Sequence, residues 1–523
     1  MSQILYALFV RKKRNKSGTV SVQIIDKSTG SYQVFKTVGS SSDPEEIERL
    51  YHQGIELIPK LIGQTSIDFA NHADRTFVTT IKNNIQSHRL IGPYLLLGHI
   101  FDQIGFNQIK DHLFKHLVIS RLSYPSSKHK TVEYMRRYMN LDYDVHKVYR
   151  YMDKLHGKYK QRIQQISYEH TLKVLGGVIS VVFYDVTTIY FEAEKEDELR
   201  ITGFSKDGKH QNPQIVLGLL VSANGYPLAY EIYEGNKFEG HTMIPVLESF
   251  RQTYQIKDLI VIADAGLMSK ENILDLTSHG LKYILGARMK NMSKEIIDKI
   301  MAQSVQDGHQ FMIDIGDGSR LIVGFSAKRA RKDALNRERG LKKLEKALAS
   351  GKLTKKHINN RGYNKYLSIS GDVNVTIDYD TYNEDAKWDG LKGYITNTNL
   401  QAGQVIEYYK ELWSIEKAFR ISKTDLRIRP IYHRLAHRIE THITISFCAY
   451  KIYKELERQL KVKKTDKSAA RVIEIINSIF AIEVTLPNSQ QIAMIPIITD
   501  NEQSQILEIF DLDSSKPLNL KMY

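Results

Sequence analysis

The sequence QVIEYYKELWSIEKAFRISKTDL, from Gln404 to Leu426, is the most informative stretch of this chain. Its apolar residues recur at steps of three and four, which predicts one long amphipathic helix with a broad buried face. Tyr409, Glu416 and Lys423 are spaced seven residues apart, so they lie along one line of that helix. A carboxylate in a buried face is costly without a cation beside it. The cation is either Arg420 or Lys423 of the same helix, or a metal ion shared with other acids.

Two further acids follow hydrophobic runs upstream of this helix. Asp185 lies in VVFYDVTTIYF and Asp264 ends the run DLIVIAD, and both runs are typical of buried strands. An ionised acid in such a strand needs a nearby cation. The small residues Ala263, Ala265 and Gly266 would let a substrate backbone approach Asp264 closely. The simpler alternatives are a cap or ion pair for Asp185 and the start of a turn for Asp264.

The order of elements over residues 171–290 predicts a mixed α/β sheet. LKVLGGVISVVFYDVTTIYFE is a strand, KDGKHQNPQ a loop, and QIVLGLLVSANGYPLAYEIYEGN a hairpin that turns at Asn224–Gly225. HTMIPVLESFRQTY and ENILDLTSHG are helices, each followed by a strand, DLIVIADAG and LKYILGAR. Three antiparallel strands followed by helix, strand, helix and strand are typical of an RNase H-like sheet. In that order the strands of Asp185 and Asp264 are neighbours, and the helix with Glu416 packs near them.

The three acids are therefore expected to converge and to hold two divalent ions. They are separated by 79 residues (264 − 185) and 152 residues (416 − 264). Such a pair of metals activates a water or a 3′-hydroxyl and stabilises the leaving oxygen of a phosphodiester. Oxygen ligands without cysteine favour Mg²⁺ or Mn²⁺. The residues alone predict metal-dependent phosphodiester chemistry.

The net charge indicates a polyanionic partner. The chain has 74 basic and 59 acidic residues, a formal charge of +15. Residues 328–361 carry 13 Lys and Arg against three acids, which is +10 of this total. This segment is either a solvated amphipathic helix or a face that follows DNA through sequence-independent, salt-sensitive phosphate contacts. Its first cations are the candidate contacts: Lys328, Arg329, Arg331 and Lys332.

Composition excludes several other classes of protein. The single cysteine, Cys448, rules out internal disulfides and Cys-rich zinc sites. Every long apolar run is broken by Pro, Gly, Asn or charge, so none is expected to span a membrane. The start MSQILYALFVRKKRNK has the reverse order of a secretory signal, which predicts a cytosolic protein. His433, His437 and His442 have helical spacing but lack partners at zinc-site distances, which favours DNA contact or packing.

The remaining segments define the expected domains. Residues 1–40 contain three β-like runs, separated by the turns NKSG and KSTG, and predict a small antiparallel module. Residues 41–170 are mainly helical, include the basic, Ser-rich loop RLSYPSSKHK, and are expected to bind a DNA end. Residues 291–389 are expected to form an inserted subdomain with the strands FMIDIG and SRLIVGF. Residues 390–460 return to the core with GLKGYITNT and the Glu416 helix, and residues 461–523 are helical and mixed.

This ordered set of segments resembles bacterial insertion-sequence transposases of the DDE type. The likeness is to the insertion-sequence-four group, whose last motif runs Tyr, Arg, Glu, Lys along one helix, and to its long, tyrosine-rich members with an N-terminal strand module. It extends over roughly residues 91–456. The matching segments are FYDVTTIYFE, GFSKDGKHQNPQIVLGLLVSANGYPL, YEGN, IADAGLMS, WDGLKGYITNT and YKELWSIEKAFRISKTDLRIRPIYHR.

The resemblance implies roles for individual residues. Asp185, Asp264 and Glu416 would be the metal-binding triad. Tyr409 and Lys423 would position DNA phosphates near the cut.

One position departs from the family pattern. The arginine expected three residues after Tyr409 is Leu412 here. Lys410 or Arg420 would then supply the missing phosphate contact.

The resemblance further implies cut-and-paste transposition with Mg²⁺ or Mn²⁺. Activated water would cleave at the ends of the element, and the freed 3′-hydroxyl would attack target DNA. The expected partners are double-stranded DNA, as terminal inverted repeats and target, and a second copy of the chain in a homodimer within the bacterial cytoplasm at the nucleoid. Two alternatives stay open: a metal-dependent nuclease of the same fold without strand transfer, and a catalytically inactive, transposase-derived DNA-binding regulator.

Overall fold

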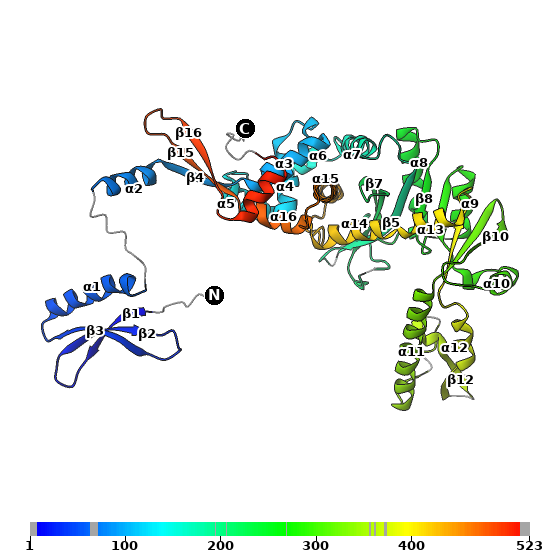
Figure 1. Cartoon of the computed structure of the whole chain (residues 1–523), viewed down its shortest axis with the longest axis horizontal. Helices are drawn as coiled ribbons and strands as arrows, with labels where there is room; N and C mark the ends of the chain where they lie inside the picture. Colours follow the sequence, from blue (N-terminus) through cyan, green and yellow to red (C-terminus); the bar gives the residue numbers. More distant parts are fainter. Residues whose placement is uncertain are drawn as a thin grey trace. The chain divides into compact units, whose positions relative to one another are not determined.

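The chain divides into two compact units in the computed structural model (Figure 1). The first is formed by residues 1–86 with 484–491, and the second by residues 87–483 with 492–523. The structure describes residues 8–62, 72–193, 195–205, 207–267, 269–354, 357–359, 362–370 and 374–512. Several residues of the sequence-based predictions lie outside these ranges: Ile4–Ala7 of the first strand, Lys206 and Met268 of the family segments, and Lys355, Lys356 and Arg361 of the basic segment.

The first unit contains an antiparallel sheet covered by a helix. Within residues 8–62 its three strands pair in the order β1-β2-β3. They are β1 (Leu8–Arg14), β2 (Val20–Asp26) and β3 (Gln33–Ser41). α1 (Pro44–Leu61) packs against all three strands, over the fully buried Val22 and Ile24. The unit therefore extends beyond the predicted module of residues 1–40 and also includes α2 (His72–Asn84).

The second unit is organised around a mixed sheet that has eight strands among the described residues, in the order β10-β11-β14-β9-β8-β5-β6-β7. β5, β6 and β7 are antiparallel neighbours, β8 and β9 run parallel to β5, and β14 is antiparallel to β9. The strands are β5 (Val181–Tyr190), β6 (Gln214–Ser222), β7 (Pro227–Glu234), β8 (Ile260–Ala263), β9 (Lys282–Gly286), β10 (Gln310–Gly316), β11 (Ser319–Phe325) and β14 (Leu391–Thr396). The predicted mixed α/β class is confirmed.

Both faces of this sheet are buried, and alternate residues of β5 enter different cores. Phe183 packs in the core that includes the helices after β14, whereas Val182 and Tyr184 pack in the core beneath α8. β6 is buried along its whole length, as its continuous apolar sequence predicts for a central strand. The helices that link β7, β8 and β9 are α8 (Met243–Tyr254) and α9 (Lys270–Ser278).

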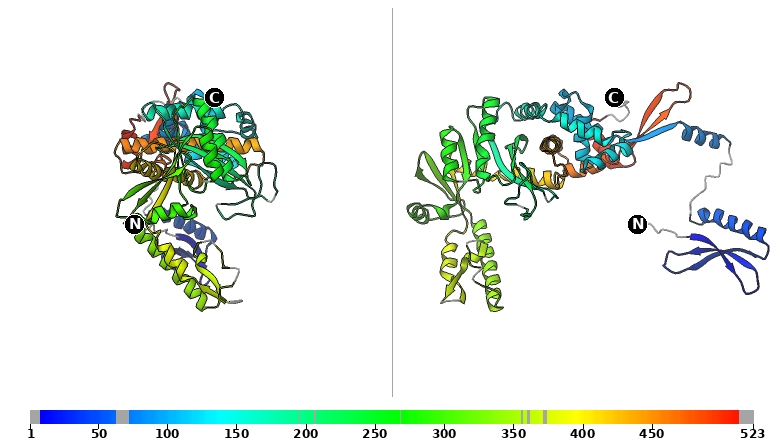
Figure 2. Two further views of the ribbon diagram at one scale, coloured as in Figure 1. Left: turned by 90° about the vertical axis from the view of Figure 1, so that its right-hand side faces the viewer. Right: turned by 180° about the vertical axis from the view of Figure 1, so that it is seen from behind.

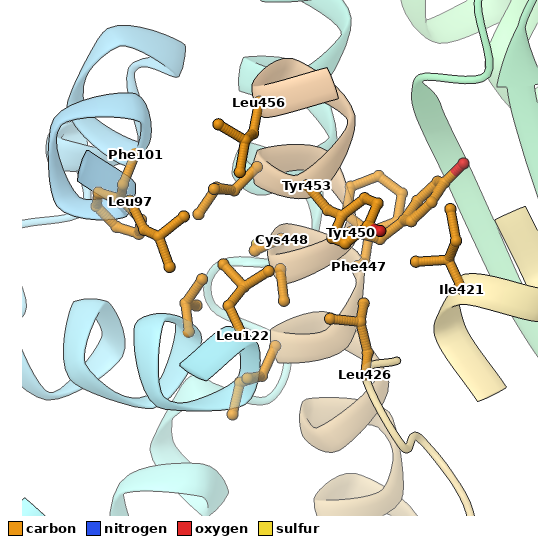
Figure 3. Close-up of a cluster of buried hydrophobic side chains, with 14 of the residues drawn as sticks. Leu97, Phe101, Leu122, Ile421, Leu426, Phe447, Cys448, Tyr450, Tyr453 and Leu456 are labelled. Carbon is orange, nitrogen blue, oxygen red and sulfur yellow. The ribbon is translucent and has the colours of Figure 1, made fainter. Parts of the chain in front are cut away.

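The other part of this unit is a helical layer around α15. α15 contacts α3, α4, α6 and α7 as well as β7, and the rear view in Figure 2 shows it end on beside helices drawn in cyan. Its Cys448 and Leu456 lie among Leu97, Phe101 and Leu122 of the earlier helices (Figure 3). These helices are α3 (Gly92–Ile104), α4 (His112–Ser123), α5 (Lys128–Met139), α6 (Val145–Leu155), α7 (Lys160–Val174), α15 (Ala436–Val462) and α16 (Ala469–Ile476).

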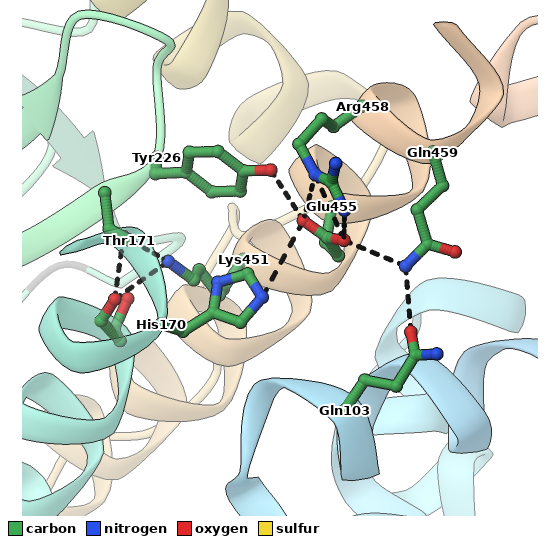
Figure 4. A network of polar contacts seen from close by, with 9 residues as sticks. Gln103, His170, Thr171, Tyr226, Lys451, Glu455, Arg458 and Gln459 are labelled. Carbon is green, nitrogen blue, oxygen red and sulfur yellow. Dashed lines mark hydrogen bonds and ion pairs between the residues drawn. The ribbon is translucent and has the colours of Figure 1, made fainter. Parts of the chain in front are cut away.

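A buried polar network joins α15 to α7 and to the β6–β7 turn (Figure 4). The Lys451 ammonium donates to the Ser167 carbonyl oxygen at 2.9 Å and lies 4.3 Å from the centroid of the Tyr226 ring. The Tyr226 hydroxyl and Arg458 both donate to the Glu455 carboxylate at 2.6 Å. Burial lowers the pKa of Lys451, and the charge of Glu455 opposes this effect. Each buried charge in this network therefore has protein partners.

The prediction of one continuous helix from Gln404 to Leu426 is wrong. The structure has α13 (Ala402–Lys410) and α14 (Trp413–Thr424), joined by a turn in which the N–H groups of Glu411 and Leu412 bond to carbonyls three residues earlier. A run of buried positions at three-residue steps explains the break, because only a 3₁₀ turn keeps such positions on one face. These positions are Ile406, Tyr409, Leu412, Ile415, Ala418 and Ile421.

The predicted insertion over residues 291–389 also needs correction. β10 and β11 extend the central sheet, because the fully buried Leu321 and Val323 of β11 pair with β14. The segment between β11 and β14 is smaller and packs α11 against β13 and the short helix η5. The elements of this segment are α11 (Ala327–Ala349), η5 (Gly362–Tyr366), β12 (Leu367–Ser370), β13 (Asn374–Ile377) and α12 (Tyr379–Ala386). A separate helix, α10 (Lys294–Met301), precedes β10.

The C-terminal region contains both strands and helices among its described residues, 461–512. β15 (Phe480–Thr485) pairs with β16 (Ile492–Ile497) and β4 (Ile85–Leu90), and α17 (Asn501–Ile509) follows. Arg89 forms an ion pair with Glu483 at 2.9 Å. In the part of the chain that the structure describes, no helix combines the length and the hydropathy needed to cross a membrane.

Candidate active site

The first two acids lie at the same level on neighbouring strands. Asp185 is on β5 and Asp264 follows directly after β8, which pairs with β5 in parallel. In that pairing Phe183 is opposite Ile262, an offset of 79 residues (262 − 183), and the offset between the acids is the same (264 − 185). Neighbouring strands are about 4.8 Å apart. The register therefore places the two acids at matching positions of neighbouring strands, at the carboxyl end of β8.

Glu416 lies on the same side of the sheet. Phe183 and Ile262, two residues before each Asp, belong to the core that also contains Ile415 and Phe419 of α14. Because side chains two apart share one face of a strand, both acids face the side that α14 covers. α14 packs against β5 and carries the exposed Glu416 in its first turn, where the helix dipole favours an acid.

Tyr409 of α13 is close to all three acids. Burial raises the pKa of its phenol above the usual range, and the negative charges of Asp264, Glu416 and Asp185 raise the pKa further. The phenol packs against Gly286 at the end of β9, where any Cβ would overlap the Tyr409 hydroxyl. The three acids thus act on one side chain at one edge of the sheet.

The oxygen ligands of Asp185, Asp264 and Glu416 fit a hard divalent cation, although the three carboxylates do not form a cluster in this structure. Among the described residues, no three His, Cys, Asp or Glu side chains form a cluster that could hold a metal ion. Asp264 accepts the N–H of Gly266 at 2.7 Å, and Asp185 accepts the N–H of Val186 at 2.8 Å. Asp264 and Glu416 are exposed. Carboxylate oxygens are the ligands that Mg²⁺ and Mn²⁺ prefer.

Lys392 of β14 is a cation at this site that the sequence analysis missed. Its ammonium lies 4.7 Å from the centroid of the Tyr409 ring and 5.6 Å from that of Tyr394. Burial lowers the pKa of Lys392, the positive charge of Arg329 lowers it further, and the negative charge of Glu416 opposes both. The signal in the sequence that could have identified Lys392 is its position as a lone lysine inside the strand sequence GLKGYIT.

The expected DNA contacts divide into two groups. Lys423 is mostly buried and forms an ion pair with Asp207 at 3.2 Å, and Arg429 pairs with the same carboxylate. Arg329 lies near Lys392 and forms an ion pair with Asp333 at 3.4 Å. The other candidates are exposed: Lys410, Arg420, Lys328, Arg331 and Lys332.

Leu412 and two of the candidate histidines have structural roles. Leu412 is buried in the core with Ile415, where it packs as an apolar residue. His437 lies 2.8 Å from a carboxylate oxygen of Asp153, and His442 bonds to the Ile428 carbonyl oxygen at 3.0 Å.

The site is thus a mixed sheet with one acid inside β5, a second directly after the neighbouring β8, and a third on the covering helix α14. Residues 176–452 match the family model described as the Transposase DDE domain, which spans more than half of the chain. The chain belongs to this family, whose activity is DNA transposition and recombination, and whose members generally use divalent metal ions.

Three solved structures are similar to parts of the chain. One is the piggyBac transposase synaptic complex with hairpin DNA, with 9% identity, 70% of this chain and 69% of that chain covered, and a TM-score of 0.38. The Mos1 transposase paired-end complex with the left transposon end has 9% identity, coverage of 32% and 56%, and a TM-score of 0.15. The Mos1 mariner paired-end complex with Mn has 11% identity, coverage of 30% and 54%, and a TM-score of 0.15. No curated protein matches the chain.

Proposed function

We propose that the chain is an insertion-sequence transposase that cleaves DNA at the ends of its element and joins the freed 3′-hydroxyl to target DNA. The observation that carries this proposal is the shared register of Asp185 and Asp264, on the face covered by the helix of Glu416. Within the family, the Tyr409–Glu416–Lys423 spacing supports the insertion-sequence-four group. We propose an RNase H-like core, because β5, β6 and β7 are antiparallel and the next strands, β8 and β9, run parallel to β5.

The three acids would hold the metal ions. Bound Mg²⁺ or Mn²⁺, as two ions, would supply activation of a water or 3′-hydroxyl and stabilisation of the leaving oxygen. Asp185 and Asp264 would ligate from the sheet, and Glu416 would complete the site by turning its exposed side chain from α14 toward them. The role of the scaffold is to hold these carboxylates at fixed strand and helix positions.

Tyr409 and Lys392 would orient the reacting phosphate. The Tyr409 phenol is protonated at neutral pH, as an ordinary tyrosine is, so it would donate a hydrogen bond to a phosphate oxygen. Lys392 would place a positive charge beside Glu416, taking over from the family arginine replaced by Leu412. This differs from the sequence-based expectation that Lys410 or Arg420 supplies that charge.

The basic surfaces would bind the rest of the DNA. The exposed cations at the start of α11 would contact phosphates without reading sequence, and Lys423 would exchange Asp207 for a phosphate. The helical region before β5 would bind the terminal inverted repeats. Two copies of the chain would each hold one element end, within the cytoplasm at the nucleoid.

A joining assay tests this function. Purified protein, Mg²⁺, a duplex of the terminal repeat and a target plasmid should give covalently joined products, and Glu416→Gln should abolish them. Joining that survives Glu416→Gln would contradict the assignment of the third acid. Cleavage without joining would identify a nuclease, and salt-sensitive binding without cleavage, unchanged by Asp185→Asn, would identify a regulator. Inverted repeats flanking the gene would favour the transposase over both.

A further inference from the structure

A large basic cavity lies beyond the end of α14, away from the three acids along that helix. Its volume is about 980 Å³. One wall is the segment from Arg121 to Lys130, which includes the start of α5, and another is the segment from Thr424 to His433. The predicted loop RLSYPSSKHK is thus largely helical: α4 ends at Ser123 and α5 begins at Lys128.

Lys128 is the unusual residue of this cavity. Its side chain is only 4% exposed, and it has no hydrogen bond or ion pair with any residue that the structure describes. Burial and the positive charge of Arg121 lower the pKa of Lys128. A buried ammonium without an acid beside it is costly for the folded chain. Lys451, which is fully buried, has the Ser167 carbonyl and the Thr171 hydroxyl as partners.

The surroundings of Lys128 are also positive. Arg121 is 4% exposed and donates only to the carbonyl oxygens of Leu426 and Arg427, at 3.4 and 3.5 Å, among the described residues. His433 lines the same cavity, and its pKa is lowered to about 3 by burial and by the charges of Lys128 and Arg121. A bound anion would offset both the burial and the mutual repulsion of these positive groups.

Further cations line the cavity together with one acidic residue, Asp425. Lys130 and Arg427 form no ion pair within the described parts of the chain, whereas Arg429 pairs with Asp207. Asp425 accepts a hydrogen bond from the Thr424 hydroxyl at 3.0 Å. Arg427 has a left-handed backbone (φ 44°), a strained conformation for a side chain of this kind and one that is frequent at functional sites.

The start of α5 adds backbone donors to the same wall. α5 has 12 residues, and Ser127 caps it by accepting the N–H of Lys130 at 3.4 Å. Its first N–H groups carry the positive end of the helix dipole, which favours a bound anion. The dipole and the unpartnered Lys128 point to the same ligand chemistry, a phosphate group.

We propose that this cavity, with Lys128 and Arg121 at its base, binds a backbone phosphate of the DNA strand that leads away from the acids. Anion binding by this cavity does not depend on the proposed function, and only the assignment of the anion to DNA rests on it. Thr424 is eight residues after Glu416, so the cavity begins about 12 Å from that acid along α14. That span is three to four phosphates along one strand, at about 3.4 Å each.

The rim of the cavity favours a nucleic acid strand over a free ion. Tyr432 and Tyr124 both line it and are 70% and 44% exposed. Tyr124 stacks on Tyr134 with ring centroids 4.8 Å apart, which fixes its ring. Aromatic rings beside a basic groove are surfaces on which bases stack. A free phosphate would make no use of them.

The salt dependence of DNA binding by Lys128→Met tests the site. The full chain is titrated with a terminal-repeat duplex at several salt concentrations without divalent metal, so binding is measured independently of cleavage and joining. The slope of log K against log salt should fall by about one for Lys128→Met, because one phosphate contact is lost. The melting temperature without DNA should stay equal or rise, because an uncompensated charge is removed.

Two further variants keep the test decisive. Lys451→Met is the matched buried lysine and should lower the melting temperature while leaving the salt slope unchanged. Arg427→Gln changes an exposed cation of the cavity and should also reduce the slope, even if Lys128→Met fails to fold. Unchanged slopes in both cavity variants would overturn the proposal, as would a lower melting temperature for Lys128→Met without a change in slope.

A final arm separates DNA from free phosphate. The melting temperatures of the wild type and Lys128→Met are compared in sodium phosphate and in sodium chloride of equal ionic strength. Stabilisation of the wild type alone by inorganic phosphate, with identical DNA slopes, would assign the cavity to a free anion and overturn the DNA assignment. Equal melting temperatures in the two salts, with the reduced DNA slope, are the expected result.

Discussion

Two groups of charged residues in the second unit differ in how their charges are compensated. In the network on α15, Glu455 accepts hydrogen bonds from Tyr226, Arg458 and Gln459, and Lys451 also has protein partners (Figure 4). At the sheet edge, neither Asp264 nor Glu416 forms an ion pair with a residue that the structure describes. The first group is compensated by the protein itself, whereas Asp264 and Glu416 are exposed to solvent.

The difference separates stability from function. Removing one member of a compensated buried network leaves another charge unpaired and destabilises the fold. Removing an uncompensated charge relieves repulsion or desolvation in the folded protein, so stability is kept and ligand binding or reaction rate is reduced instead. Substitutions in the two groups should therefore have opposite signatures in unfolding and activity measurements.

Asp264→Asn should have the largest effect. We expect joining and cleavage to fall by at least about 10³-fold, roughly 4 kcal/mol of transition-state stabilisation, because a metal-binding carboxylate is lost. The free energy of unfolding should stay equal or rise. Rates from the joining assay and chemical denaturation measure both. Asp258→Asn, at the other end of β8, is the control, and equal losses in the two variants would contradict the assignment.

Glu455→Ala should have the next largest effect, on stability alone. Loss of this carboxylate leaves Arg458 and the Tyr226 hydroxyl without their partner, and we expect the free energy of unfolding to fall by about 3 kcal/mol. Joining below the melting transition should match the wild type. Glu474→Ala, in an exposed ion pair with Arg471, is the control. Reduced joining by a fully folded Glu455→Ala protein would contradict the claim that the α15 network affects stability alone.

Lys392→Met should have an intermediate effect on activity. We expect a loss of about 30-fold in joining, near 2 kcal/mol, because one charged hydrogen bond to the reacting phosphate disappears. Lys282→Met, which removes an exposed lysine at the start of β9, should retain full activity. Single-turnover rates with the terminal-repeat duplex measure the difference. Full activity of Lys392→Met would instead assign to Lys410 or Arg420 the phosphate contact that the family arginine makes at the position of Leu412.

His433→Gln should have the smallest effect, confined to acidic pH. The folded pKa is depressed to about 3 from 6.5, so the contribution of neutral His433 is present above pH 6.5 and is lost as pH falls toward 3. At pH 5.5 the variant should therefore gain about 1 kcal/mol relative to the wild type, and at pH 8 the two should differ little. Urea denaturation at both pH values measures this, and an equal difference at both would exclude titration of His433.

The sequence was sufficient to predict the class of fold and the strand neighbours. The order of apolar runs implied that β5 and β8 are adjacent, and the 79-residue spacing of Asp185 and Asp264 equals their register. The break between α13 and α14 was not predicted. Buried positions three residues apart fit one face of an α-helix over a short window, and they leave that face only over a longer run.

Other features depend on contacts between distant segments. Lys392 reads as an ordinary strand residue until α13 brings Tyr409 against it. Lys128 and His433 are far apart in the sequence, so their shared cavity has no local signal. β10 and β11 are strands by pattern, but only their pairing with β14 assigns them to the central sheet.

Mn²⁺ binding is the most direct test of a single metal centre formed by Asp185, Asp264 and Glu416. Electron paramagnetic resonance titrations of the full chain on terminal-repeat DNA should give an affinity for Mn²⁺ that falls at least about 10-fold in each of Asp185→Asn, Asp264→Asn and Glu416→Gln. Asp258→Asn should bind Mn²⁺ like the wild type. Unchanged Mn²⁺ affinity in Glu416→Gln would contradict a centre shared between the sheet edge and α14.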